Sequence, residues 1–233
     1  MQLRFATYNI RKGKGASGRA QMTEALGKAL AEHSLDLVLC QEVFHGTDGP
    51  HQTDLLSQAL GLGLYYGRNK ERRVGHHGNA TFARGEVEHS ENFDISTNPI
   101  ERRGVLYTRL NWHGQRMHVF NAHLGLNQGQ RRRQIEQIGA LIKEKCANEP
   151  VLLAGDFNDW NGRLDAIVTR ELGLTNAFPE AVRTWHAQRP LFNLDRVYVR
   201  HLRPTQQRCM SGQPWRDLSD HLPLFAELSI ANG

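Results

Sequence analysis

The sequence predicts an α/β (α+β) fold in which mixed β-sheets are covered on the outside by helices. Short apolar runs, bounded by polar residues and glycines, recur along the whole chain, as expected of buried strands. Fewer segments show helical spacing, and only some of these lie between strands in βαβ order. This combination favours mixed sheets with external helices over a helical bundle or a purely parallel sheet.

The individual elements follow from these patterns. Strands are expected at residues 3–9, 35–41, 79–84, 103–112, 116–123, 151–155, 194–199 and 223–230. Apolar residues at helical spacing predict helices at residues 20–33, 52–60, 130–146 and 161–172. The stretch from Asn111 to Gln115, which contains glycine, predicts a hairpin turn between two of the strands.

Composition places the chain among ordinary globular proteins. The chain has no repeat, low-complexity tract or Pro/Ser-rich linker, so one domain is expected to fill residues 1–233. Three widely spaced cysteines argue against a disulfide framework or a zinc knuckle. The first residues resemble a strand more than a signal peptide, and no apolar run approaches the roughly 18–20 residues that span a bilayer. A cytoplasmic location is the resulting expectation.

The formal charge of +5 has two interpretations, which composition alone leaves open. A basic surface concentrates anionic ligands such as nucleic acid, phospholipid or phosphorylated metabolites. A modest positive charge is equally well explained as a solubility feature.

Polar side chains repeatedly follow or interrupt apolar runs, and strand ends at one rim of a sheet meet in space. The residues concerned are Asn9, Gln41, Glu42, Asn121, His123, Asp156, Asn158, Asp195, Asp220 and His221. Each alone could be a turn residue, a cap, a solvated acid or a core histidine. Together, carboxylates, amides and imidazoles without cysteine ligands favour a hard cation, Mg²⁺ or Mn²⁺.

Seven short motifs in order resemble the endonuclease/exonuclease/phosphatase superfamily, which includes deoxyribonuclease I. They are Thr7–Ile10, Gln41–Glu42, Gly78–Ala80, Asn121–Leu124, Gly155–Asn158, Leu194–Val197 and Ser219–Leu222. Each motif is weak alone. The seven together occur in the family's order, and the match extends over residues 4–228. Other stretches, such as Gly75–Asn79, resemble the small bacterial YbhP-like branch. The resemblance implies a deoxyribonuclease I-like four-layer αββα sandwich of two mixed sheets, with the active site at one edge.

The resemblance also implies a metal site and a catalytic group. Glu42 matches the metal-ligating glutamate, Asn9 would position the metal or its waters, and Asp220 would lie near the metal. Asp156 matches the aspartate that orients or deprotonates the attacking water. His221 would bind a non-bridging oxygen or act as acid or base.

The remaining matched residues would position groups or bind phosphate. Asp195 matches the carboxylate partner of His221, and Asn158 matches an amide that binds a phosphate oxygen. His123 would donate to the phosphate or protonate the leaving group, and Asn79 would also contact phosphate. Arg103 is the best arginine for a bidentate phosphate contact, with a solvated strand-edge arginine as the alternative.

Three features have two open interpretations each. Arg131, Arg132 and Arg133 open a helix, where they either bind a ligand or form a solvated face. Residues 68–77 are basic and are expected to form a loop, either gripping substrate or merely exposed. Trp160 either stacks on a base or wedges against lipid, or it packs in the interior.

The expected function is divalent-metal-dependent hydrolysis of a phosphodiester, with DNA or RNA as the favoured substrate. The alternative is hydrolysis of phospholipid head groups or small phosphorylated molecules, with peripheral membrane contact only. A more remote alternative is an inactive binding module, which would have no chemical need for the full set of acids and imidazoles. We expect a monomer without an obligate protein partner.

Overall fold

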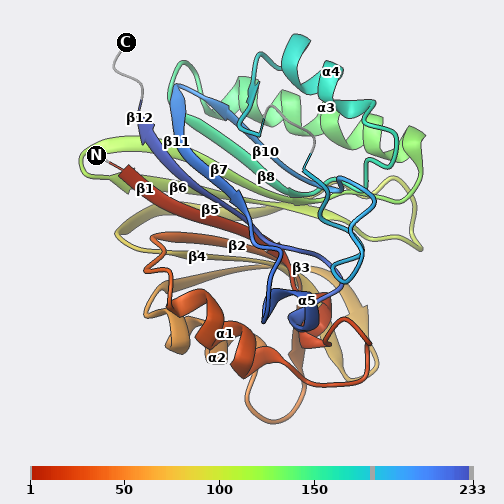
Figure 1. Ribbon diagram of the computed structural model, residues 1–233. Helices are drawn as coiled ribbons and strands as arrows, with labels where there is room; N and C mark the ends of the chain where they lie inside the picture. The colour runs from red at the N-terminus through yellow and green to blue at the C-terminus, as the bar shows by residue number, and fades with distance from the viewer. Residues whose placement is uncertain (1, 179–181, 231–233) are drawn as a thin grey trace.

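The computed structural model, which describes residues 2–178 and 182–230, contains two six-stranded sheets packed face to face. Helices cover the outer face of each sheet, so the chain forms four layers (Figure 1). This confirms the predicted αββα sandwich of mixed sheets. Within the described residues, no helix combines the length and apolarity needed to cross a membrane.

The first sheet has the strand order β11-β12-β1-β2-β4-β3. Its strands are β1 (Gln2–Asn9), β2 (Leu37–Gly46), β3 (Gly63–Arg72), β4 (Gly75–Ala83), β11 (Leu202–Cys209) and β12 (Leu224–Ile230). Helices α1 (Thr23–Ala31) and α2 (Gln52–Leu60) cover its outer face, and the short α5 (Trp215–Leu218) lies beside them (Figure 1).

The second sheet has the order β5-β6-β7-β8-β10-β9. Its strands are β5 (Glu86–Asp94), β6 (Gly104–Trp112), β7 (Gln115–His123), β8 (Val151–Asp156), β9 (Thr175–Asn176) and β10 (Asp195–Arg200). Helices α3 (Gln128–Lys145) and α4 (Leu164–Arg170) cover its outer face (Figure 1).

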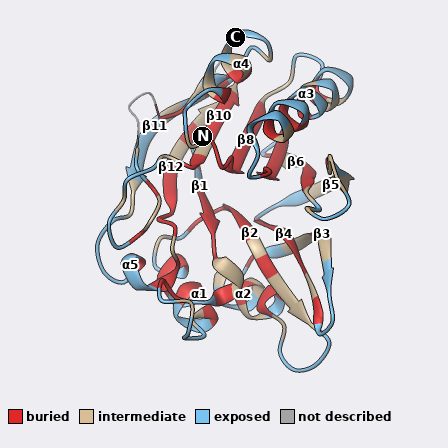
Figure 2. Cartoon of the chain, turned by 90° about the vertical axis from the view of Figure 1, so that its right-hand side faces the viewer, coloured by how far each residue is buried: buried red, intermediate tan, exposed pale blue. Residues whose placement is uncertain are grey.

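The central strands are apolar on both faces because both faces are covered. In β2, Leu37 and Leu39 face the core between the sheets, whereas Val38 and Cys40 face the core under α1 and α2. β8 alternates in the same way between the two sheets and the layer of α3 and α4. Burial is therefore concentrated in the middle strands, and the outer surfaces of helices and edges are exposed (Figure 2).

Strand direction brings the polar strand ends together at one end of the sandwich. β1 and β2 are parallel, and Asn9, the last residue of β1, pairs with Gln41 in the middle of β2. β7 and β8 are also parallel, and His123 pairs with Asp156. β10 runs antiparallel to β8, so its first residue, Asp195, lies beside Asp156.

All eight predicted strands and all four predicted helices are present, with shifted ends. The turn at residues 111–115 is confirmed as a hairpin in which His113 and Gly114 both have positive φ. The interpretation of residues 68–77 as a loop is wrong, because they form the end of β3, a tight turn and the start of β4. β3 is an edge strand whose side chains are mostly polar and partly exposed, so it lacks the apolar pattern of a buried strand.

Gly155, immediately before Asp156, has a backbone conformation that other residues rarely adopt. Its φ is +140°, and a Cβ atom there would lie 1.9 Å from the carbonyl oxygen of Ala122 on the paired strand β7. Gly155→Ala is therefore expected to lower the free energy of unfolding by about 3 kcal/mol, measured by urea denaturation. Gly173→Ala is the matched control, because its φ is +67° but no atom lies within 4 Å; it should cost about 1 kcal/mol. Equal losses would contradict the steric explanation.

Candidate active site

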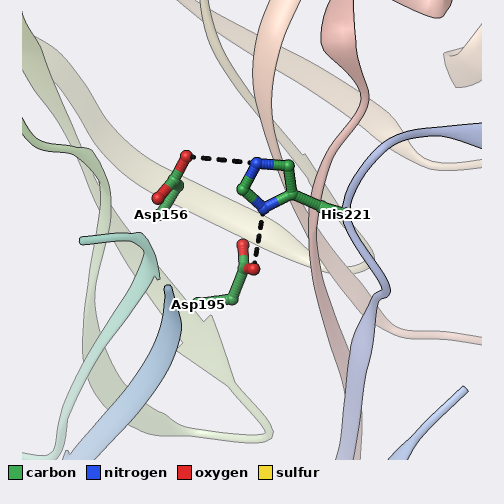
Figure 3. A group of neighbouring side chains, drawn as sticks. All are labelled: Asp156, Asp195 and His221. Atoms are coloured by element: carbon green, nitrogen blue, oxygen red, sulfur yellow. Dashed lines mark hydrogen bonds and ion pairs between the residues drawn. The ribbon is translucent and has the colours of Figure 1, made fainter. Parts of the chain in front are cut away.

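The centre of the site is a chain of three buried side chains from three separate segments. Asp195 Oδ2 accepts a hydrogen bond from His221 Nδ1 at 2.9 Å. His221 Nε2 faces Asp156 Oδ2 at 3.7 Å (Figure 3). All three residues are at most 5% exposed. The fold therefore brings together the predicted histidine, its carboxylate partner and the predicted catalytic aspartate.

The charges of this group differ from those of the same side chains in water. Burial opposes protonation of the imidazole, but the carboxylates of Asp195 and Asp156 outweigh it and raise the pKa of His221 to about 10. Burial raises the pKa of Asp156 to about 6, against the opposing influence of His221. The group thus combines a stable imidazolium with a carboxyl group whose pKa is close to neutrality.

Both oxygens of Asp156 are held in place by neighbours. Its Oδ2 accepts a hydrogen bond from Asn9 Nδ2 at 2.8 Å, and its Oδ1 accepts one from the Asn158 backbone N–H at 2.9 Å. His123 Nε2 lies 3.5 Å from Oδ2. Asn158 has a φ of +49°, and its side-chain amide donates to the Leu124 carbonyl. The predicted residues Asn9, His123 and Asn158 therefore all line the same centre as Asp156.

Glu42 projects from a β-bulge in the middle of β2. Gln41 and Glu42 together oppose the single residue Asn79 of β4, since Cys40 pairs with Ala80 and Val43 with Gly78. Glu42 has a φ of +55°, an unfavourable value for a residue with a side chain. Bulges of this kind redirect side chains and are frequent near active sites.

The Glu42 carboxylate has a cation for its neighbour. It forms an ion pair and hydrogen bond with the ammonium group of Lys12. Burial opposes ionisation of Glu42, but Lys12 outweighs it and lowers the pKa of the carboxyl group. An ionised, partly accessible carboxylate that already attracts a cation fits a magnesium or manganese ligand.

Two groups of side chains are chemically able to hold a metal ion. The ligand atoms of Asp156, Asp195 and His221 lie within 4.8 Å of one another. The Glu42 carboxylate is the second candidate, because it is partly accessible, whereas Asp195 and His221 Nδ1 are already occupied by their mutual hydrogen bond. Carboxylate oxygen with few protein ligands is also the environment that Mg²⁺ prefers.

Asp220 and Asn9 are linked to each other through Arg11. Arg11 Nε lies 3.3 Å from Asp220 Oδ2, and the Arg11 backbone N–H donates to Asn9 Oδ1 at 3.0 Å. Ser219 donates to the Asn9 carbonyl at 2.7 Å. These contacts fix both residues beside the centre, although each has already used part of its capacity as a ligand.

Arg103 lies next to His123. Its guanidinium pairs with Glu101 at 2.9 Å and approaches His123 Nδ1 at 3.5 Å, and its side chain is 13% exposed. Burial, with help from the positive charge of Arg103, lowers the pKa of His123 well below its usual value. His123 is therefore neutral, and an Arg103 N–H directed at Nδ1 places the ring proton on Nε2, facing Asp156. Arg103 is not the solvated strand-edge arginine of the alternative interpretation.

Asn79 holds the two sheets together beneath the site. Its Nδ2 donates to the carbonyls of Gly104 and Asn121, both at 3.0 Å, and the residue is 1% exposed. The Asn121 and Gln41 side chains are hydrogen-bonded to each other across the same interface. The geometry gives Asn79 a structural role, and its predicted phosphate contact stays a prediction.

Two cations near the centre, Lys12 at Glu42 and Arg11 at Asp220, were not predicted from the sequence. A third basic group, the buried His77, belongs to the basic segment 68–77 for which substrate gripping was one of two interpretations. Burial and the neighbouring Lys12 lower the pKa of His77 to about 4. Arg11 and Lys12 follow Asn9 closely at the end of β1, and that position was the available signal for them.

The arginines that open α3 have separate roles. Arg131 is 2% exposed, and its guanidinium donates to the carbonyl oxygens of Leu126 and Gly125. Arg132 is exposed and pairs with Glu136 one helical turn later. Arg131 thus supports the loop after β7, which contradicts a solvated face at that position.

Trp160 is half-buried against other aromatic residues. Its ring meets those of Trp185 and Phe192 edge-on, with centroids 5.2 and 5.1 Å apart. It therefore packs on a neighbouring loop and keeps part of its surface accessible.

Comparisons with known proteins give matches over nearly the whole chain. Residues 6–221 match the model of the Endonuclease/Exonuclease/phosphatase family. The chain is 36% identical to the uncharacterized protein YbhP of Escherichia coli K12, over 96% of this chain and 95% of that one.

Solved structures share the fold at low sequence identity. An endonuclease/exonuclease/phosphatase from Bacteroides vulgatus has a TM-score of 0.83 at 23% identity and covers 99% of each chain. D. rerio TDP2, solved with a single-strand DNA product, has a TM-score of 0.76 at 18% identity, covering 98% of this chain and 99% of its own. The mannosyl-6-phosphatase Bt3783 of Bacteroides thetaiotaomicron also has a TM-score of 0.76, at 20% identity, covering 97% and 99%. At these identities the likeness shows the fold alone.

The match therefore extends over nearly the whole chain and includes the segments that build the buried Asp156–His221–Asp195 group. This chain belongs to the endonuclease/exonuclease/phosphatase family.

Proposed function

We propose that the protein is a divalent-metal-dependent phosphoesterase that hydrolyses a phosphodiester bond. The observation that carries this proposal is the buried Asp195–His221–Asp156 group, at the same end of the sheets as the Glu42 carboxylate. A phosphodiester resists attack because its anionic oxygens repel nucleophiles. Hydrolysis therefore needs a base for water and positive charge for the phosphate.

Asp156 is the group best suited to accept the proton of the attacking water. A general base works best when its pKa is close to the working pH, and burial raises the pKa of Asp156 to about 6. Asn9 and Asn158 hold its two oxygens in a fixed orientation.

His221 and Arg103 supply positive charge for the phosphate oxygens. His221 stays an imidazolium at neutral pH, because two carboxylates raise its pKa to about 10. Asp195 fixes the orientation of the ring through Nδ1, which leaves Nε2–H for Asp156 or for a non-bridging oxygen. His123 is neutral and presents its Nε2–H to the same space.

Glu42 would hold the metal ion, with Asn9 and Asp220 orienting it or its waters. A bound Mg²⁺ or Mn²⁺ supplies Lewis-acid neutralisation of the phosphate and a more acidic water. Lys12 then has to move aside from Glu42, or bind phosphate itself.

Glu42→Gln is expected to raise the Mg²⁺ concentration for half-maximal activity about 100-fold, because a neutral amide is a much weaker ligand for a hard cation. The measurement is a Mg²⁺ titration of bis-p-nitrophenyl phosphate hydrolysis. Glu32→Gln, at an exposed glutamate that follows α1, is the control and should titrate like the wild type. An unchanged titration in Glu42→Gln would show that other residues bind the metal.

The substrate class is a second part of the proposal. A groove of about 1050 Å³ beside Lys12 also contains Lys14, Arg72 and Arg73, which favours a substrate with several negative charges. Nucleic acid, the expectation from the sequence, satisfies this condition, and so does an anionic membrane.

A substrate panel tests the reaction. The purified protein is assayed with Mg²⁺, Mn²⁺ or chelator against plasmid DNA, single-stranded DNA, RNA, bis-p-nitrophenyl phosphate, a phosphomonoester and phospholipid vesicles. Metal-dependent turnover of a diester supports the proposal. Absence of turnover of every ester by folded protein would favour an inactive binding module instead.

A further inference from the structure

Large exposed hydrophobic side chains are confined to one end of the described structure. Five such residues are known among the described positions: Val74, Ile100, Leu126, Leu191 and Phe192, with exposed fractions of 61%, 82%, 60%, 56% and 36%. Each lies in a loop or turn at the end of the sheets that carries the active site. We call them the apolar tips.

Two tips lie on the loops next to Arg103 and His123. Ile100 belongs to the loop that leads into Arg103 and β6. Leu126 follows His123 closely, and its backbone N–H donates to Glu101, the partner of Arg103, at 3.2 Å.

The other tips frame the site from the remaining sides. Leu191 and Phe192 fold back on Trp185 through backbone hydrogen bonds of 2.7 and 2.8 Å, and Trp185 forms a β-bridge with His221. Val74 forms the turn between β3 and β4, and its carbonyl accepts from Thr47 just beyond the end of β2. The tips therefore lie on several different loops at the catalytic end.

The opposite end of the sandwich has a different surface. Its turns expose mainly glycine and small or polar residues, such as Ser34, Gly85, Gly114, Asn148 and His201. Isolated exposed apolar residues are normal on any protein. Among the residues the structure describes, however, all five lie at the catalytic end. This clustering indicates a surface that binds a ligand.

Basic side chains accompany the apolar tips. Arg72 and Arg73 immediately precede Val74, Lys70 donates to the Ile100 carbonyl at 2.9 Å, and Arg102 lies two residues after Ile100. Aliphatic tips among basic residues suit a membrane, because apolar side chains enter the acyl boundary while lysine and arginine meet anionic headgroups.

Nucleic acid explains the basic residues but not the aliphatic ones. Single-stranded nucleic acid binds to aromatic faces on which bases stack. Val74, Ile100, Leu126 and Leu191 have no such face. Trp160 and Trp185, packed with Phe192, have the amphipathic character of residues at a membrane surface.

We propose that the catalytic end docks on an anionic phospholipid bilayer through the apolar tips, and that the phosphodiester of a phospholipid is the substrate. The second part rests on the proposed function. Docking would place Asp156 and His221 at the level of the headgroups, without requiring a membrane-spanning segment.

Vesicle sedimentation tests the docking without turnover. The protein is mixed in chelator with phosphatidylcholine vesicles, with or without phosphatidylglycerol. We expect sedimentation with the anionic vesicles and roughly 100-fold weaker partitioning of the double variant Ile100→Glu/Leu191→Glu, because two inserted side chains are replaced by charged ones. The matched control, Asn148→Glu/His201→Glu, introduces the same residues at the opposite end and should sediment like the wild type.

Fluorescence and turnover provide independent readouts. Emission from Trp160 and Trp185 should shift to shorter wavelength on anionic vesicles in the wild type and not in the double variant. With Mg²⁺, the ratio of vesicle turnover to bis-p-nitrophenyl phosphate turnover should fall with the loss of binding. Failure of the catalytic proposal would appear separately, as absence of turnover of every ester.

Three outcomes would overturn the inference. The first is absence of wild-type sedimentation with anionic vesicles at low salt. The second is equal sedimentation of the tip and control variants. The third is binding of a single-stranded oligonucleotide that is tighter than vesicle binding and is weakened by the tip variant, which would assign the surface to nucleic acid.

Discussion

Asp156→Asn is expected to lower kcat/KM for bis-p-nitrophenyl phosphate about 1000-fold, the scale of a lost general base. Asparagine has nearly the same shape and can still accept the Asn158 N–H through its oxygen. It cannot take a proton from water. Asp156 is buried between Asn9, His123 and His221. Among the described residues no other carboxylate makes these three contacts, so none is placed to replace it as the base.

Asp159→Asn provides a matched control for this experiment. Asp159 is also buried and lies three residues away, but it accepts hydrogen bonds from the backbone N–H groups of Arg163 and Leu164 at the start of α4. Its replacement should reduce stability by about 1 kcal/mol and leave turnover intact. Thermal denaturation separates the two effects. Similar losses of activity in both variants would show that Asp156 acts through the fold and not through chemistry.

The parts of the fold that were predictable are those buried on both sides. β2 and β8 begin with uninterrupted apolar runs and β1 is largely buried, so their sequences specify the strands, although β2 continues past the predicted end at residue 41 to Gly46. β3, β5 and β11 lie at sheet edges and expose much of their length, and they were not predicted. An edge strand is formed by pairing with its one neighbour, which local sequence does not encode.

The same reasoning applies to the site. Strand ends predicted which residues meet, and Asp156, Asp195 and His221 do meet. The bulge at Glu42 was not predictable, because it depends on a two-to-one register against Asn79 of β4. The Lys12–Glu42 pair and the buried Arg131 likewise depend on contacts between segments far apart in the sequence or on loop geometry. Sequence patterns specify burial and the approximate position of elements, whereas cross-strand register is a property of the assembled sheets.

His221 and Asp195 are expected to behave as one unit. His221→Ala should lower kcat/KM about 1000-fold, because it removes the imidazolium that stabilises phosphate charge. Asp195→Asn should cost about 100-fold, because the ring loses its anionic partner at Nδ1 and part of its positive charge. The measurement is steady-state hydrolysis of bis-p-nitrophenyl phosphate by each single variant and by the double variant.

The double variant distinguishes two roles for Asp195. If Asp195 acts only by positioning His221, then removing it from a protein that already lacks the imidazole has little further effect, and the double variant resembles His221→Ala. Losses that multiply would show that Asp195 has an effect independent of the ring. Because Asp156, Asp195 and His221 also form the compact group able to hold a cation, an independent effect would place the metal there in preference to Glu42. A Mg²⁺ titration of Asp195→Asn would then shift as strongly as that of Glu42→Gln, whereas a positioning role leaves the titration unchanged while turnover falls.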